Sequence, residues 1–224
     1  MDPRYLKNIP ALSAEEQELL GTKKIFIAGC GGLGGYLLEF AERLGIGEIT
    51  AADGDSFASS NLNRQLLADS GNIGQAKTQA ALLRCRKVNP DVRLSVIPEF
   101  IVPGNAAAGL IKGCDAVLDG LDSAEDRRFM VSACREENIP YIYGSISGWT
   151  AQTALIMPGD RHLDYIYGQG KAVASDGALS FTPAMCAAME LSICVRLLCG
   201  RNIRSGELFC FDLQNMEFHR LQLD

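Results

Sequence analysis

A glycine-rich turn and a distant arginine are the features of this sequence best suited to chemistry. The turn reads Gly29-Cys30-Gly31-Gly32-Leu33-Gly34, and its glycines would let phosphates approach backbone N–H groups at the positive end of a helix. Arg64 can bind a triphosphate through bidentate hydrogen bonds, a contact that a nicotinamide-dependent dehydrogenase does not normally need there. The pattern favours a nucleotide that is a reactant rather than a redox cofactor.

Lys77 and Asp122 extend the same chemistry. Lys77 lies in the first turn of a predicted helix, where a cation is unfavourable unless an anion neutralises it. A phosphate contact would supply that anion, and a solvated lysine is the alternative. Asp122 follows a predicted parallel strand, where doubly wound sheets bind ligands. A lone carboxylate beside phosphate oxygens is a usual Mg²⁺ arrangement, although Asp122 could also be a helix-capping acid.

Three further acids are less discriminating. Asp53 ends a predicted strand about 20 residues beyond the glycines, where a carboxylate accepts hydrogen bonds from ribose hydroxyls. NAD and ATP both carry that ribose, so Asp53 does not separate them. Asp55 can be a turn residue, and the place of Asp119 within a predicted strand favours a structural role.

The elements around the glycines predict half of a doubly wound α/β sheet. A strand over 24–28, a helix over 33–44 and a strand over 48–52 form the phosphate-binding unit, followed by a long polar connection over 53–74. Ser123 and Thr182 are expected to cap helices, with Pro183 at the first position of the second. The other predicted elements are helices over 75–87, 106–111, 123–138 and 183–199, strands over 93–98, 116–119, 140–144 and 150–157, and a hairpin over 208–221.

Composition limits the function classes. The 224 residues are 47 % hydrophobic and carry a formal net charge of −6, which suits a single domain and gives no support for nucleic-acid binding. The sequence shows neither a signal peptide nor a long apolar run, so we expect no membrane segment. The eight cysteines form no C-x-x-C pair, and most lie in apolar segments typical of buried, reduced thiols. We therefore expect a cytoplasmic location.

Three motifs together resemble a known family: Ser60-Asn61-Leu62-Asn63-Arg64-Gln65, Gly74-Gln75-Ala76-Lys77 and Leu121-Asp122. They are similar to the HesA/MoeB/ThiF family of ubiquitin-activating-enzyme-like adenylyltransferases, over nearly the whole chain. The resemblance implies an α/β, Rossmann-like, mostly parallel sheet extended by antiparallel C-terminal strands, with helices on both faces. It also implies adenylation, with MgATP, of the C-terminal Gly-Gly carboxylate of a small β-grasp protein.

We expect residues 1–224 to form one adenylation domain. Its parts are an N-terminal arm and helix over 1–22, a nucleotide-binding half over 23–145, and antiparallel strands, a crossover segment and a helix over 146–224.

The resemblance also implies roles for single residues. Arg64 and Lys77 would hold phosphates and stabilise charge on the leaving pyrophosphate, and Asp122 would position Mg²⁺, so these three are the predicted catalytic residues. Because the substrate carboxylate itself attacks the α-phosphorus, catalysis needs positioning and electrostatics but no general base. The other predicted nucleotide contacts are Gly29, Gly31, Gly32, Gly34, Asp53, Ser60, Asn61, Leu62, Asn63, Gln65, Ser123 and Lys7.

The sequence departs from the family pattern at several points. Lys7 stands where family members present an arginine to the ATP of the other protomer, so a homodimer is implied with a weaker contact. The turn at 158–160 is not followed by the paired cysteines that hold zinc in many members, so we expect no zinc. The crossover segment over 158–180 has no cysteine, and Cys186 has an apolar helical setting that favours the core. Sulfur delivery is therefore expected from a separate donor protein.

The sequence also allows other functions. A member of the family could adenylate a small molecule or an RNA base, although the acidic charge speaks against RNA. A non-catalytic, nucleotide-binding partner subunit would not need Arg64, Lys77 and Asp122. An NAD-dependent oxidoreductase would leave Arg64 and Lys77 unused. Trp149 can belong either to a partner-binding groove or to the core.

Overall fold

The computed structural model of the chain describes residues 2–101, 107–168 and 176–223. These residues contain an eight-stranded sheet in the order β3-β2-β1-β4-β5-β6-β7-β8. Strands β1 to β5 run parallel, and β6 to β8 continue the sheet antiparallel. The strand bounds are β1 Lys24–Ala28, β2 Glu48–Ala52, β3 Arg93–Ile97, β4 Ala116–Asp119, β5 Tyr141–Ser147, β6 Thr150–Ile156, β7 Glu207–Asp212 and β8 Glu217–Gln222.

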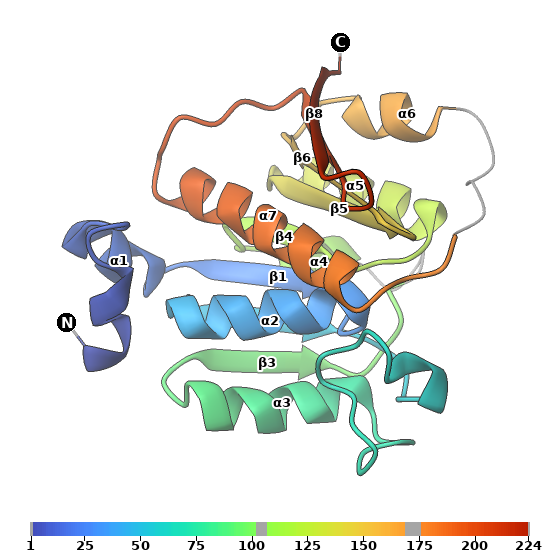
Figure 1. The fold of residues 1–224 in the computed structure, drawn as a ribbon. Helices are drawn as coiled ribbons and strands as arrows, with labels where there is room; N and C mark the ends of the chain where they lie inside the picture. The colour runs from blue at the N-terminus through green and yellow to red at the C-terminus, as the bar shows by residue number, and fades with distance from the viewer. Residues whose placement is uncertain (1, 102–106, 169–175, 224) are drawn as a thin grey trace.

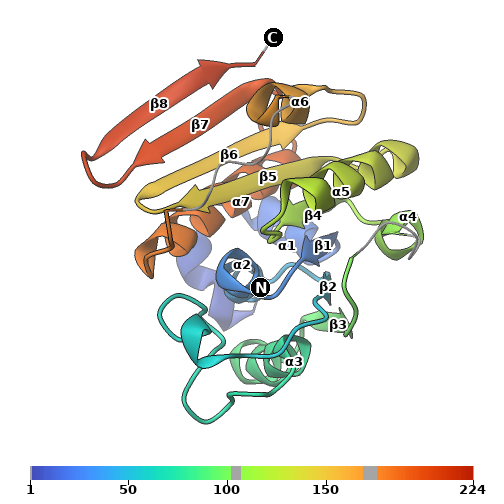
Figure 2. The ribbon, with the colours of Figure 1, turned by 90° about the vertical axis from the view of Figure 1, so that its right-hand side faces the viewer.

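Helices cover both faces of this sheet (Figures 1 and 2). On one face α2, α3 and α7 share a buried cluster with Ile25 and Ile49, and on the other α4, α5 and α6 share one with Phe26 and Val117. Successive strand residues thus point into opposite cores, which confirms the predicted α/β fold. The helices are η1 Pro3–Asn8, α1 Ala14–Leu20, α2 Gly32–Leu44, η2 Ser59–Asn61, α3 Lys77–Val88, α4 Ala107–Ile111, α5 Ala124–Glu137, α6 His162–Tyr167 and α7 Phe181–Leu198.

Two helix starts differ from the predictions by two residues, and the other predicted helix starts by one. α7 begins at Phe181, and Thr182 is not its cap, because the Thr182 hydroxyl donates a 2.9 Å hydrogen bond to the carbonyl of Gly148. Pro183 therefore occupies the third helical position, still within the first turn where proline is tolerated. α3 begins at Lys77 rather than Gln75, because the carbonyl of Gln75 accepts a hydrogen bond from the loop.

The larger remaining differences lie in the C-terminal half, and elsewhere the bounds differ by at most one residue. β5 extends three residues beyond the predicted end at Gly144, since it pairs with β6 along its full length. The crossover segment contains α6, which was not predicted, and residues 169–175 of it lie outside the described chain, as does the first residue of the helix predicted over 106–111. The hairpin of β7 and β8 is confirmed.

α7 is a core helix. Among the described residues it alone has the length and apolar composition of a membrane-crossing segment, and half of that stretch is buried. It packs against α2 and strands β4, β5 and β6. Its buried side chains face the sheet, so its apolar character is explained by its place in the core.

Candidate active site

The glycine-rich turn joins β1 to α2 and requires glycine for steric reasons. Gly29 has φ +101°, and a Cβ there would lie 2.5 Å from the carbonyl oxygen of Gly120. A Cβ at Gly34 would lie 1.8 Å from the carbonyl oxygen of Gly29, so Gly34 permits close packing within the turn. Gly31 precedes α2 without a side-chain cap, which leaves backbone N–H groups at the positive helix end open to a ligand.

A cavity of about 530 Å³ lies beside this turn. It sits at the carboxyl ends of β1, β2 and β4, where the strand order reverses between β1 and β4, as ligand sites do in doubly wound sheets. The predicted site residues that line it are Gly29, Gly31, Gly32, Asp53, Arg64, Gln65, Lys77 and Asp122. The structure therefore brings all three predicted catalytic residues to one cavity from three separate segments.

The loop between β2 and α3 has a structural part and a cavity-facing part. Asn61 Oδ1 accepts a hydrogen bond from the N–H of Ala58, and Asn63 Nδ2 donates to the carbonyl of Ala178. Arg64 Nη1 donates to Asn63 Oδ1 at 2.9 Å and to the carbonyl of Ser60 at 3.0 Å. These contacts orient the guanidinium. The predicted residues that do not line the cavity are Ser60, Asn61, Leu62, Asn63, Gly34, Ser123 and Lys7.

Asp53 is already bonded to the protein on both carboxylate oxygens. Its Oδ2 accepts the N–H of Cys30 and its Oδ1 accepts the N–H of Asp55, each at 2.8 Å. These contacts tie the glycine turn to the end of β2. A carboxylate accepts about four hydrogen bonds, so Asp53 retains capacity for the ribose hydroxyls predicted for it.

Lys77 is buried and already paired. Its Nζ lies 2.7 Å from Asp55 Oδ2, and its backbone N–H donates to the carbonyl of Asp55 at 3.0 Å. The idea that Lys77 lacks a neutralising anion is therefore wrong, because Asp55 supplies one. Asp55 is also more than a turn residue, and Lys77 lowers the pKa of its carboxyl. Lys77 still lines the cavity, so a phosphate would meet a cation shared with Asp55.

Gln65 is a buried amide at the cavity. Its side chain is enclosed beside Gly31, and its Oε1 has no hydrogen-bond partner among the described residues. A buried amide oxygen without a partner is costly. A donor from a bound ligand would remove that cost, which fits the predicted ligand contact of Gln65.

Asp122 presents an unpaired carboxylate to the cavity. Unlike the cavity acids Asp53 and Asp55, Asp122 and the nearby Asp126 make no side-chain hydrogen bond or ion pair with any described residue. An exposed oxygen donor beside an expected triphosphate fits Mg²⁺, which binds through one or two carboxylates plus phosphate oxygens. Asp126 also lines the cavity. Within the described ranges no three His, Cys, Asp or Glu side chains gather into a metal-binding group.

The cysteines are buried or partly buried, whereas Trp149 is exposed. All eight cysteines are free, and Cys186 is buried as predicted. Burial raises the pKa of the Cys30 and Cys186 thiols, which makes them poor nucleophiles. Trp149 is partly exposed at 44 %, with its ring 5.2 Å from that of Phe181, so it is not a core residue.

Arg127 is a cavity residue that the sequence interpretation missed. It lies in the first turn of α5, lines the cavity and forms a buried ion pair with Asp119, Nε to Oδ2 at 2.8 Å. The signal was the same as for Lys77, a cation near a helix N-terminus. The predicted structural role of Asp119 agrees with this pairing.

Comparison with known proteins identifies the family. A model of the ThiF family matches residues 4–224. The chain belongs to the ThiF family. Among curated relatives of this ThiF-family chain, tRNA threonylcarbamoyladenosine dehydratase of Haemophilus influenzae is 36 % identical over 132 residues, covering 58 % of this chain and 51 % of that protein. SAMP-activating enzyme E1 of Haloferax volcanii is 25 % identical over 224 residues, covering 96 % and 83 %.

The fold of this ThiF-family chain also occurs in solved structures. The crystal structure of E. coli MccB with MccA superposes with a TM-score of 0.84 at 21 % identity, covering 99 % of this chain and 71 % of that chain. At this identity the likeness concerns the fold alone. The matched region spans about half the length of the dehydratase relative.

Proposed function

We propose that this chain is an ATP-dependent adenylyltransferase that activates the C-terminal Gly-Gly carboxylate of a small ubiquitin-like sulfur-carrier protein, in thiamine, molybdopterin or related sulfur transfer. The observation that carries the proposal is the meeting of Arg64, Lys77 and Asp122 at one cavity beside an uncapped helix N-terminus. The ThiF family match and the similarity to an activating E1 enzyme over nearly the whole chain support it.

The chemistry follows from these groups. A carboxylate oxygen of the carrier attacks the α-phosphorus of ATP, the bond from that phosphorus to the bridging oxygen breaks, and pyrophosphate leaves with the electron pair. Arg64 and Lys77 stabilise the charge that develops on the leaving group. The α2 amides bind phosphate oxygens. No proton is removed from the nucleophile, so the site needs no general base.

Mg²⁺ belongs to the proposal as a bound partner of ATP. Asp122 would hold it, and the ion would neutralise phosphate charge when bound. The protein's own contribution is to keep that carboxylate free of other partners and facing the cavity. Zinc is not part of the proposal.

The proposed partners extend beyond the nucleotide. We infer a homodimer in which Lys7, exposed on η1, contacts the other protomer's nucleotide, and a separate protein that donates sulfur. The single-domain organisation over 1–224 and a cytoplasmic location without nucleic-acid or membrane binding are parts of the same proposal.

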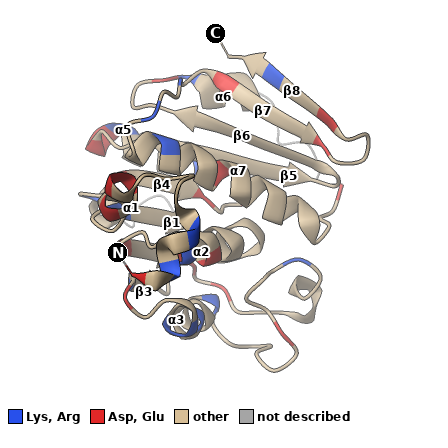
Figure 3. Cartoon of the chain, turned by 60° about the vertical axis from the view of Figure 1, so that its left-hand side comes forward, with Lys and Arg blue, Asp and Glu red and all other residues tan. Residues whose placement is uncertain are grey.

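A second candidate function is adenylation of an RNA base. It is favoured by the 36 % identity to a tRNA threonylcarbamoyladenosine dehydratase, which exceeds the identity to the activating E1 enzyme. The charge distribution speaks against it, since acidic and basic segments are interspersed along the chain (Figure 3) and the net charge is −6. An RNA-binding surface is normally basic.

ATP–pyrophosphate exchange tests the proposal. We expect exchange with a β-grasp carrier that ends in Gly-Gly, no exchange when its last glycine is removed, and a loss on the order of 100-fold in Arg64→Ala. The exposed Arg135→Ala on α5 is the matched control and should keep parental exchange. Exchange that requires tRNA would favour the second candidate. ATP binding without exchange for any substrate would indicate a non-catalytic subunit, and NAD binding without exchange would reverse the assignment.

A further inference from the structure

The backbone on both sides of Asp122 is held by hydrogen bonds. On one side, Asp119 Oδ1 accepts the N–H of Leu121 at 2.9 Å, and the Arg127 guanidinium donates to the carbonyl of Leu121. On the other, Ser123 caps α5 with its side chain, and its carbonyl accepts the N–H of Arg127 at 3.2 Å. Asp122 therefore stands on a fixed segment while its carboxylate stays free toward the cavity.

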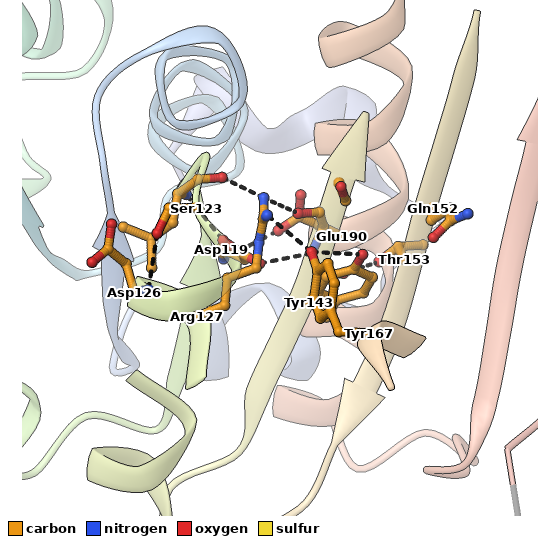
Figure 4. Close-up of polar contacts among 12 residues, drawn as sticks. Asp119, Ser123, Asp126, Arg127, Tyr143, Gln152, Thr153, Tyr167 and Glu190 are labelled. Atoms are coloured by element: carbon orange, nitrogen blue, oxygen red, sulfur yellow. Dashed lines mark hydrogen bonds and ion pairs between the residues drawn. The ribbon is translucent and has the colours of Figure 1, made fainter. Parts of the chain in front are cut away.

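The Arg127 guanidinium is hydrogen-bonded to the protein through each of its three nitrogens. Besides Asp119, its Nη1 donates to the hydroxyl of Tyr167 at 2.9 Å, and its Nη2 donates to the carbonyl of Gly144 at 3.1 Å (Figure 4). The side chain is only 6 % exposed. A guanidinium bonded through all three nitrogens cannot turn toward a ligand without breaking these contacts, so its role is to hold the surrounding backbone.

Glu190 of α7 also holds this segment, through a hydrogen bond to its backbone. Its Oε2 accepts the N–H of Asp119 at 3.2 Å. It reaches that position only because β5 has Gly144, where a Cβ would lie 1.8 Å from Glu190 Oε1. Burial and the charge of Asp119 raise the pKa of Glu190 well above its ordinary value. Burial raises the pKa of Asp119 as well, while the charge and hydrogen bond of Arg127 oppose that shift.

We propose that Arg127 and Asp119 are positioning residues that hold the Asp122 carboxylate in place for the divalent cation that accompanies the nucleotide. The inference rests on the proposed function, because the cation arrives with ATP. A carboxylate held in advance loses less conformational entropy on binding a cation than one on a mobile loop. Contacts that orient a metal ligand contribute about 10- to 100-fold in metal affinity.

The test uses the double variant Arg127→Gln/Asp119→Asn in the full-length chain. Removing both charges avoids leaving one buried charge unpaired, which would unfold the protein. Arg135→Gln on the same helix is the matched control. Hydrogen exchange in the nucleotide-free protein reports on the backbone around Asp122. Calorimetric titration with ATP, at zero and at saturating Mg²⁺, gives the gain in ATP affinity that Mg²⁺ produces.

We expect exchange of the amides at 120–123 to be about tenfold faster in the double variant, with α2 amides unchanged. The Mg²⁺-dependent gain in ATP affinity should fall about 10- to 100-fold, as in Asp122→Asn, whereas the affinity without Mg²⁺ stays within about twofold of the parent. Tyr167→Phe keeps the ion pair and removes one hydrogen bond to Arg127 and one to Tyr143. Its Mg²⁺-dependent gain in ATP affinity should therefore fall only about threefold.

The outcomes distinguish a failure of this inference from a failure of the proposed function. Faster exchange with an unchanged Mg²⁺ gain would overturn the positioning role and leave the proposed function intact. Unchanged exchange at 120–123, in the double variant or, should that variant not fold, in Tyr167→Phe, would also overturn it. A parent protein with no affinity for ATP, or an Asp122→Asn variant that keeps the full Mg²⁺ gain, would overturn the proposed site and this inference together.

Discussion

At the scale of single residues, the pair of Lys77 and Asp55 shows how this site holds cationic charge before a ligand binds. Lys77 is buried, whereas the Asp55 side chain is 54 % exposed. A triphosphate that binds Lys77 must therefore share or replace the Asp55 contact, and the acid repels the incoming phosphates. Asp55 thus stabilises the buried lysine at the expense of nucleotide affinity.

Asp55→Asn should therefore change stability and binding in opposite directions. We expect ATP affinity to rise about threefold because one repulsive charge is removed, and the free energy of unfolding to fall by about 1 kcal/mol because Lys77 loses its ionic partner. Titration calorimetry and urea unfolding measure the two quantities. Asp69→Asn, in the exposed part of the same loop, is the control. Weaker ATP binding in Asp55→Asn would show that the acid orients the lysine instead.

At the scale of elements, local signals predict much of the fold. β1, β2 and β4 have the predicted bounds, because apolar runs between glycine or charged residues are local signals. The convergence of Arg64, Lys77 and Asp122 followed from the motifs and the rule for ligand sites in doubly wound sheets. The start of α7, however, depends on the contact between Thr182 and Gly148, and the Lys77–Asp55 pair depends on loop pairing. No local pattern encodes such contacts between distant segments.

The packing of α7 against β5 gives a prediction at this scale. A methyl group at Gly144 would overlap Glu190 Oε1, so Gly144→Ala should lower the free energy of unfolding by about 1–3 kcal/mol. In a Glu190→Ala background the same change should cost less than about 1 kcal/mol, because the space is then free. Urea unfolding of the four proteins in this double-mutant cycle measures the coupling. Additive effects would show that the two elements separate at this point without cost.

At the scale of the whole molecule, the sheet order places the site, and the buried acids Glu42 and Glu190 make stability depend on pH. The order β3-β2-β1-β4 brings the glycine turn, the loop after β2 and the Asp122 segment to one end of the sheet. Helix α2 carries Glu42, which is 1 % exposed. Its two carboxylate oxygens have no hydrogen-bond partner among the described residues. Such a group makes global stability depend on pH.

Burial, and to a smaller extent the charge of Glu39, raise the pKa of Glu42 to about 7 against the opposing effects of Cys85, Arg84 and Arg43. Because this folded-state pKa exceeds the unfolded value, the native protein binds the extra proton, and Glu42 destabilises the fold as pH rises from about 4.5 to 7. Glu42→Gln removes that loss. At pH 8 the free energy of unfolding of Glu42→Gln should exceed that of the parent by about 3.5 kcal/mol, since the shift is about 2.5 pKa units and each unit corresponds to about 1.4 kcal/mol.

Urea unfolding at pH values of about 5, 6, 7 and 8, which span the shift, gives the free energies of unfolding of the parent and of Glu42→Gln. The two stabilities should lie within about 1 kcal/mol at pH 5, where the parent's Glu42 is protonated, and diverge above it. Glu190, whose pKa burial also raises, contributes a slope in the same direction in both proteins, so only their difference reports on Glu42. The exposed Glu136→Gln variant should follow the parent throughout. Parallel stability curves for parent and Glu42→Gln would mean that Glu42 is solvated when ionised.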